Sequence, residues 1–224
     1  MKKIAVFCDC IANGMCSMYV LNNNNIKSIT GLKNLNIKAK KRYSIINSLK
    51  EKYDVTVFFY PSRTEHDSNE LRGKKFKVNV PIVYEILNTD LTKFDIILIF
   101  GCTHSYFYNI NELGNSTDLT SKTILGAYNL IFKELREKYN NKKIIFIQVP
   151  YRKYNKKMKF SEYVSIIHEH VTNNGFYSIN FYDDILKNNK HPFKYFPDGA
   201  HPSIDMEIIL TDYIVKKIED YVNN

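Results

Sequence analysis

The chain has little glycine, proline and cysteine, and it has no long hydrophobic run. Only 8 Gly and 6 Pro occur in 224 residues, against 17 Tyr and 14 Phe. This composition excludes collagen-like and linker-like sequence and argues against disorder. No apolar run approaches the roughly 20 residues of a membrane span, so we expect no membrane partner. A chain of this length can bury about 70% of its extended surface, and therefore needs no disulfide or structural metal to fold.

The amino terminus and the cysteines both indicate a cytoplasmic protein. The opening MKKIAVF imitates a signal peptide, but Asp9 interrupts the apolar run, so the segment is better interpreted as a first strand. The four cysteines are Cys8, Cys10, Cys16 and Cys102, and three of them lie within nine residues. This spacing does not resemble the disulfide framework of a secreted protein, so we expect reduced thiols.

The net charge is a weak guide to partners. Lys and Arg total 32 against 23 Asp and Glu, a formal charge of +9. Such a charge can indicate an anionic partner. Lys, Asn and Ile are enriched throughout the chain, however, and the basic clusters contain no known nucleic-acid motif. We therefore expect no nucleic-acid partner, and the oligomeric state is left open.

Short apolar runs alternate with segments of helical periodicity along the whole chain. Apolar runs without polar alternation are typical of parallel strands that are covered on both faces. The pattern predicts one doubly wound α/β domain over residues 1–224, with a five-stranded parallel sheet flanked by helices. The expected strands are 3–7, 54–60, 94–100, 143–149 and 177–181, and the expected helices are 38–53, 80–87, 120–139, 161–171 and 203–221.

Three polar clusters are expected at the carboxyl ends of the strands, where open parallel sheets place their sites. One follows the first strand, one follows the third, and one precedes the last helix. They are Cys8-Asp9-Cys10-Ile11-Ala12-Asn13-Gly14, Gly101-Cys102-Thr103-His104-Ser105 and Asp198-Gly199-Ala200-His201-Pro202. Although they are distant in sequence, we expect them to lie close together in space.

The residue types in these clusters form an activated nucleophile. Cys10 stands where a strand turns into the next segment, so that a helix start there would lower the pKa of its thiol. Asp198 and His201 are three residues apart across a glycine-containing turn and can place a carboxylate beside an imidazole. The carboxylate orients the ring, and the ring can take the proton of the thiol.

These residues resemble the motifs of the SGNH, or GDSL, hydrolases. The segment from Cys8 to Gly14 matches the family's first motif, Gly-Asp-Ser with Asn-Gly a few positions later, with Cys10 at the nucleophile position. The final Asp-x-x-His-Pro motif is matched outright by residues 198–202. The resemblance implies a flavodoxin-like sheet with strand order 2-1-3-4-5. It also implies that Cys10 is the nucleophile, His201 the general base and acid, and Asp198 the orienting carboxylate.

The remaining motifs of that family concern the oxyanion hole. Gly101 to Ser105 resembles the third motif and puts His104 where the family has an Asn, so His104 and the Cys10 backbone N–H are expected to stabilise the oxyanion. The second motif should offer a glycine N–H after the second strand, but residues 60–66 contain no Gly. Ser62 or Arg63 is the expected donor there, and Asp9 completes the oxyanion and substrate-binding set.

A thiol at the nucleophile position changes the expected chemistry. An acylated Cys10 is a thioester, which amines and thiols attack readily compared with water. We therefore expect an esterase or acyltransferase that acts on an ester or thioester of a small molecule or a carrier-linked acyl group. No cofactor or metal is expected.

Two other interpretations stay open. Cys8, Cys10, Cys102, His104 and His201 could together bind zinc, although this spacing is unusual for a structural site. A relative that binds a ligand without turnover is the other alternative.

His168 and His170 also look like a metal pair. Residues two apart on a helix point about 200° away from each other, so we predict surface residues at both positions.

Overall fold

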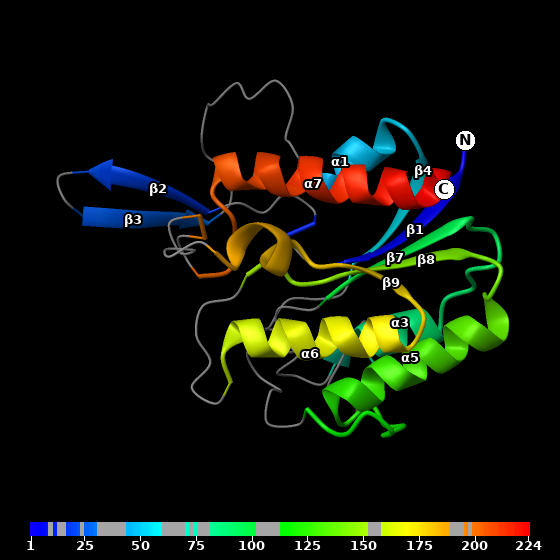
Figure 1. Ribbon diagram of the computed structural model, residues 1–224. Coiled ribbons are helices and arrows are strands. Elements are labelled where there is room, and N and C mark those ends of the chain that lie inside the picture. Colours follow the sequence, from blue (N-terminus) through cyan, green and yellow to red (C-terminus); the bar gives the residue numbers. More distant parts are fainter. Residues whose placement is uncertain are drawn as a thin grey trace.

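The fold is organised around a parallel five-stranded sheet (Figure 1). The computed structural model describes residues 1–8, 11–12, 17–22, 25–30, 44–59, 70–71, 74–75, 81–101, 113–151, 158–188, 195–196 and 199–224. The sheet consists of β1 (Lys3–Cys8), β4 (Asp54–Phe59), β7 (Ile96–Phe100), β8 (Lys143–Ile147) and β9 (Tyr177–Ile179). The spatial order β4-β1-β7-β8-β9, with every pairing parallel, confirms the predicted order 2-1-3-4-5.

Helices cover both faces of this sheet, as Figure 1 shows. One face carries α1 (Ile45–Lys50) and α7 (Ile204–Asn223), which contact each other. The other face carries α3 (Pro81–Leu87), α5 (Ile124–Lys138) and α6 (Phe160–Asn173). Among these described helices, none combines the length and the apolar character that crossing a bilayer requires.

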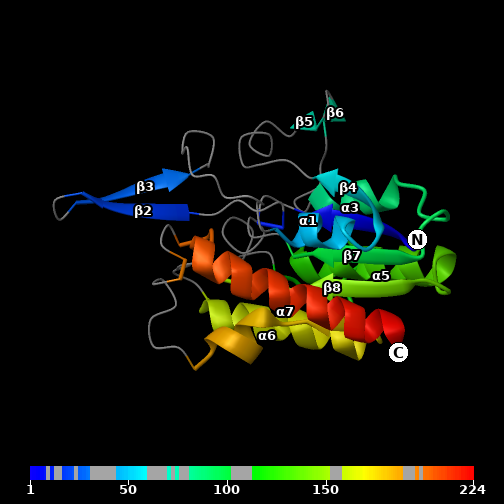
Figure 2. The ribbon, with the colours of Figure 1, turned by 90° about the horizontal axis from the view of Figure 1, so that it is seen from above.

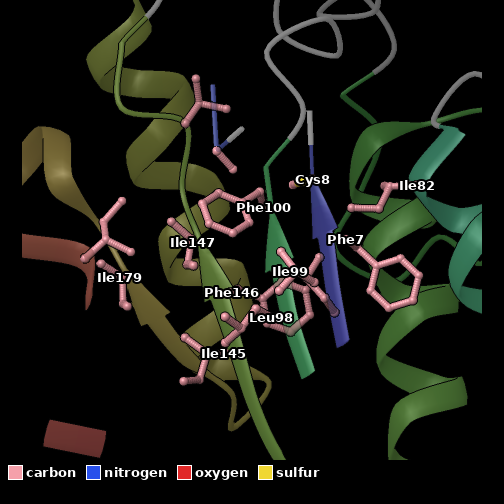
Figure 3. Close-up of a cluster of buried hydrophobic side chains, with 14 of the residues drawn as sticks. Phe7, Cys8, Ile82, Leu98, Ile99, Phe100, Ile145, Phe146, Ile147 and Ile179 are labelled. Atoms are coloured by element: carbon pink, nitrogen blue, oxygen red, sulfur yellow. The ribbon is translucent and has the colours of Figure 1, made fainter. Parts of the chain in front are cut away.

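Because helices cover both faces of the sheet, the central strands are continuous apolar runs. All five residues of β7 are buried, and so are five of the six residues of β1 (Figure 3). Aromatic rings join the layers: Phe132 of α5 packs edge to face against Phe146 of β8, with ring centroids 5.5 Å apart. Apolar burial on both faces is therefore the main stabilising contribution to the sheet.

Two antiparallel strand pairs and a π-helical turn were not predicted. β2 (Ser17–Asn22) and β3 (Asn25–Thr30) pair antiparallel, separated in sequence by two residues, the length of a tight hairpin connection. This hairpin extends away from the sheet on the side where the parallel strands end (Figure 2). A short pair, β5 (Glu70–Leu71) and β6 (Lys74–Lys75), and a π-helical turn, Tyr182–Leu186, complete the set. The first expected helix is described only in part, as α1, because residues 38–43 lie outside the described chain.

The surface assignment of His170 was wrong. His170 is only 7% exposed, and its Nε2 lies 2.8 Å from Oδ1 of Asn129. It follows Tyr163 by seven and Ile167 by three residues on the buried stripe of α6, so helical periodicity points it inward. Burial lowers the pKa of its imidazole. His168 is half-buried, with Nδ1 2.9 Å from Oγ of Ser178, so the pair faces different partners.

Candidate active site

The carboxyl ends of four strands lie at one level. Cys8 pairs with Phe59, and Phe7 pairs with Ile99, which in turn pairs with Phe146. The segments that follow β1, β4, β7 and β8 therefore leave the sheet along the same edge. Cys8 itself is 0% exposed inside the core, so its thiol is a packing group (Figure 3).

The chain on both sides of His201 is held by backbone hydrogen bonds. The N–H of Gly199 donates to the carbonyl oxygen of Phe196 at 2.8 Å, and the N–H of Ser203 donates to that of Tyr195 at 2.7 Å. Gly199 has φ +85°, a left-handed conformation that glycine adopts without a steric penalty. His201 is half-buried between these two contacts. Its backbone position is thus set by the turn that precedes α7.

Helix α7 begins at the carboxyl edge of the sheet, just after this turn, because it runs antiparallel to the strands. At its far end, Nζ of Lys2 donates to the carbonyl oxygen of Val222 at 3.5 Å, and Nζ of Lys143 donates to that of Tyr221 at 3.3 Å. Lys143 begins β8 and Lys2 immediately precedes β1, so the helix ends at the amino edge. A helix of 20 residues spans about 30 Å, longer than any strand of the sheet. His201 therefore lies at the carboxyl edge.

A small cavity of about 10 Å³, the size of one water molecule, lies where α7 meets this edge. Ile11 from the segment after β1 and Leu210 from α7 both line it, together with Gly101 at the end of β7. The N–H of Ile46 donates to the carbonyl oxygen of Ala12 at 3.3 Å, which ties the same segment to α1. The described residues that line it are Ile11, Ile45, Phe100, Gly101, Ile147, Gln148, Val149, Pro150, Leu210 and Ile214. The residues after β1 and β7 thus share one space with α7.

Gly101 allows the close approach of β7 and β8 at this edge. Its N–H donates to the carbonyl oxygen of Ile147 at 2.7 Å. A Cβ at this position would lie 3.2 Å from Cγ2 and 3.3 Å from the backbone N of Val149. The loop that carries the third predicted motif therefore leaves the sheet from a position where a side chain is crowded.

Aromatic contacts join the segment after β8 to the turn that holds His201. The ring of Tyr151 lies 5.1 Å from that of Phe196 and 5.7 Å from that of Phe160, the first residue of α6. Burial raises the pKa of the Tyr151 hydroxyl, which keeps this contact uncharged. The segment after β8, the start of α6 and the turn before α7 are thus packed together.

Glu207 is a candidate site residue that the sequence patterns did not single out. It is 1% exposed, and neither carboxyl oxygen has a hydrogen-bond partner within the part of the chain that the structure describes. Thr211, four residues later, is also 1% exposed, and its Oγ1 has no partner there either. Burial raises the pKa of Glu207 to about 9. Helical periodicity could have identified it from the sequence, because Glu207 lies on the same face of α7 as the apolar residues Ile214 and Ile218.

Of the predicted site residues, His201 is the one within the described chain. The others, Cys10, Asp198, His104, Asp9, Ser62 and Arg63, lie outside the described residues. Cys102, which the zinc interpretation requires, also lies outside them. Within the described residues, His, Cys, Asp and Glu form no group of three that could hold a metal ion.

Comparison with known proteins supports the fold. No protein-family model and no curated protein sequence matches this chain. A structure of a protein from Lactobacillus plantarum is 15% identical, has a TM-score of 0.65, and is matched over 98% of this chain and 97% of that one. A structure provisionally described as a GDSL-like lipase from Bacteroides ovatus is 14% identical, with a TM-score of 0.56 and coverage of 100% and 98%.

A lipase/acylhydrolase structure from Enterococcus faecalis gives the same result. It is 15% identical, with a TM-score of 0.54 and coverage of 98% of this chain and 96% of that one. At this identity the likeness is one of fold. The chain therefore has the α/β fold of GDSL-like lipases and acylhydrolases, with helices on both faces of a parallel sheet.

Proposed function

We propose that this chain is an SGNH/GDSL-like enzyme that acts on an ester or thioester through an acyl-Cys10 intermediate, as an esterase or acyltransferase. The observation that carries the proposal is the position of His201, half-buried at the carboxyl edge and held by the turn before α7. Cys8 and Ile11, which flank positions 9 and 10 in sequence, lie at that same edge. The lipase and acylhydrolase descriptions of structures with this fold support ester chemistry.

In the first half-reaction His201 takes the thiol proton of Cys10, with Asp198 orienting the imidazole. The sulfur forms a bond to the acyl carbon, and the carbonyl oxygen becomes an oxyanion. The Cys10 backbone N–H and His104 donate hydrogen bonds to that oxygen, and the backbone N–H of Ser62 or Arg63 is a further donor. Asp9, whose carboxylate only accepts hydrogen bonds, contacts the substrate. The bond to the leaving alcohol or thiol then breaks, and His201 returns the proton to the leaving group.

In the second half-reaction the thioester passes its acyl group to an acceptor. Water gives hydrolysis, whereas an amine or a thiol gives acyl transfer. In either case the bond from carbon to sulfur breaks and Cys10 recovers its proton through His201. We further propose that residues 1–224 act as one domain in the cytoplasm on a small-molecule or carrier-linked acyl substrate. No cofactor takes part in these steps.

The test is intact-mass spectrometry after brief exposure to 4-nitrophenyl acetate. The expected result is one acetyl adduct that peptide mapping assigns to Cys10. It is absent from Cys10→Ala and strongly slowed in His201→Ala. Cys16→Ala is the matched control and should acetylate like the wild type. A wild type that forms no adduct, or an adduct that survives Cys10→Ala, contradicts the proposal; stoichiometric zinc with protected thiols would favour a metal site instead.

A further inference from the structure

Glu207 stands on the buried face of α7, near the start of the helix. The buried positions 207, 211, 214 and 218 follow one another by four, three and four residues, which is the spacing of a single helical stripe. Ile214 and Ile218 continue this stripe as ordinary core residues. Two polar side chains at its beginning, Glu207 and Thr211, therefore face the interior where apolar ones would pack better.

These two side chains share the helix stripe that reaches the cavity at the carboxyl edge through Ile214. Leu210 and Ile214 line that cavity, and Glu207 precedes them by three and seven residues on the same side of the helix. Glu207 is thus about one helical turn beyond Leu210 in the direction of His201. Ile11, the neighbour of Cys10 in sequence, lines the same cavity.

The polar atoms here lack partners, which is costly inside a protein. Among the described residues, both carboxyl oxygens of Glu207 and Oγ1 of Thr211 are buried without a hydrogen bond. A buried polar group left unpaired costs about 1–3 kcal/mol, so natural proteins keep few such groups. Of the described residues that line the cavity, Gln148 has the one polar side chain, and its Nε2 donates to Oγ of Ser178 at 2.9 Å. A bound ligand can supply the missing donors.

The number and kind of these atoms point to the ligand. A primary ammonium group has three N–H donors and no acceptor, and within the described chain three oxygens that can accept hydrogen bonds are unpaired here. Burial raises the pKa of Glu207, so its carboxyl group is protonated in the free protein. When it releases that proton on amine binding, the positive charge of the ammonium group compensates the carboxylate, which an alcohol or water cannot do. We propose that Glu207 and Thr211 bind the amino group of a primary amine that is the acyl acceptor.

This inference rests on the proposed function for its chemistry. The ammonium group gives one proton to the Glu207 carboxylate, and the free amine attacks the thioester carbon of acyl-Cys10. A C–N bond forms, the C–S bond breaks, and the second amine proton passes through His201 to the sulfur of Cys10. The products are an amide, the Cys10 thiol and a protonated Glu207.

The first experiment measures amine binding without turnover. The melting temperature of the full-length protein is recorded with methylammonium chloride and, as a control, with sodium chloride at equal ionic strength. Binding to the native state should raise the melting temperature of the wild type above the control. Glu207→Gln should lose the increment, whereas Glu85→Gln, a buried glutamate on α3, should keep it. An equal increment in wild type and Glu207→Gln, or none in the wild type, overturns the inference.

The second experiment measures the fate of the acetyl group. Wild type and variants are treated with 4-nitrophenyl acetate and methylamine, and the ratio of N-methylacetamide to acetate is determined. Because the ratio is taken per acetyl group released, it does not depend on the acetylation rate. Glu207→Gln should lower it about tenfold, and Thr211→Val should lower it less. An unchanged ratio in both variants overturns the inference.

The two experiments separate the two proposals. If Cys10 is never acetylated, the proposed function fails, and the melting-temperature increments still decide whether the amine site exists. If Cys10 is acetylated but the product ratio is the same in the Glu207 and Thr211 variants as in the wild type, the proposed function is supported and the amine site is contradicted.

Discussion

The backbone N–H of Ser203 donates a 2.7 Å hydrogen bond to the carbonyl oxygen of Tyr195, and the chain between them carries His201. Ser203 is also the N-cap of α7, since its Oγ accepts a hydrogen bond from the N–H of Met206 at 3.3 Å. One serine thus connects the proposed base to both the preceding turn and the last helix. The position of His201 should therefore be sensitive to changes in this cap.

Ser203→Ala should weaken both stability and acylation. Loss of an N-cap costs about 1 kcal/mol of unfolding free energy. Because the cap adjoins His201, we also expect slower acetylation of Cys10. Thr123→Ala is the matched control: Thr123 caps α5 by accepting from the N–H of Gly126 at 3.2 Å. It should lose stability by urea denaturation without the same loss of acetylation rate. Equal acetylation by the two variants would contradict the connection.

Cys10→Ser should shift the product ratio toward hydrolysis. The oxygen ester that this variant forms is attacked by amines less readily, relative to water, than the thioester on Cys10. The experiment mixes an activated acetyl ester with a competing primary amine and quantifies amide and acetate for both proteins. The same ratio in both would argue against the thioester interpretation. The Cys16→Ser protein controls for the loss of a thiol elsewhere in the chain.

The stability of the protein should fall as the pH rises through the neutral range because of Glu207. Its folded-state pKa is about 9, against an ordinary value of 4.5. Between these values the folded protein holds a proton that the unfolded chain has released, so each rise in pH favours unfolding. The contribution is on the order of 1 kcal/mol per pH unit, is fully present below about pH 4.5, and is lost as the pH reaches about 9.

Urea denaturation of wild type and Glu207→Gln, from about pH 5 to about pH 9, checks this expectation. The difference in unfolding free energy between the two proteins should grow with pH in favour of the variant. Parallel curves would show that Glu207 titrates normally. Glu85→Gln supplies the comparison for replacing a buried glutamate on the other face of the sheet.

Gly101→Ala should cost about 1–2 kcal/mol and disturb the loop after β7. The added Cβ would lie 3.2 Å from Cγ2 of Val149 and 3.4 Å from the carbonyl oxygen of Ile147, so the two strand ends must separate slightly. We expect slower acetylation of Cys10, measured by intact mass. Gly175→Ala is the control, since Gly175 has φ +78° with no atom within 4 Å of an added Cβ and lies at the end of α6 away from the site. It should lose stability but not acetylation rate.

Much of the architecture follows from sequence periodicity alone. Strands such as β7 and β8 are apolar at nearly every position, because a parallel sheet is covered on both faces. That pattern predicted the strands and helices of the sheet and their parallel arrangement. The β2–β3 hairpin escaped prediction because a short antiparallel pair beside the sheet lacks such a run.

The candidates for nucleophile, base and orienting carboxylate were also proposed from the sequence, because the motif residues stand a few positions apart within Cys8–Gly14 and Asp198–Pro202. The tertiary structure alone decided what those patterns could not. His170 is buried against Asn129 because α6 turns that stripe inward. Glu207 is buried, without a hydrogen-bond partner among the described residues, because α7 lies over the sheet beside α1. Burial and the pairing of polar atoms arise from contacts between segments that are distant in sequence, and local spacing does not encode them.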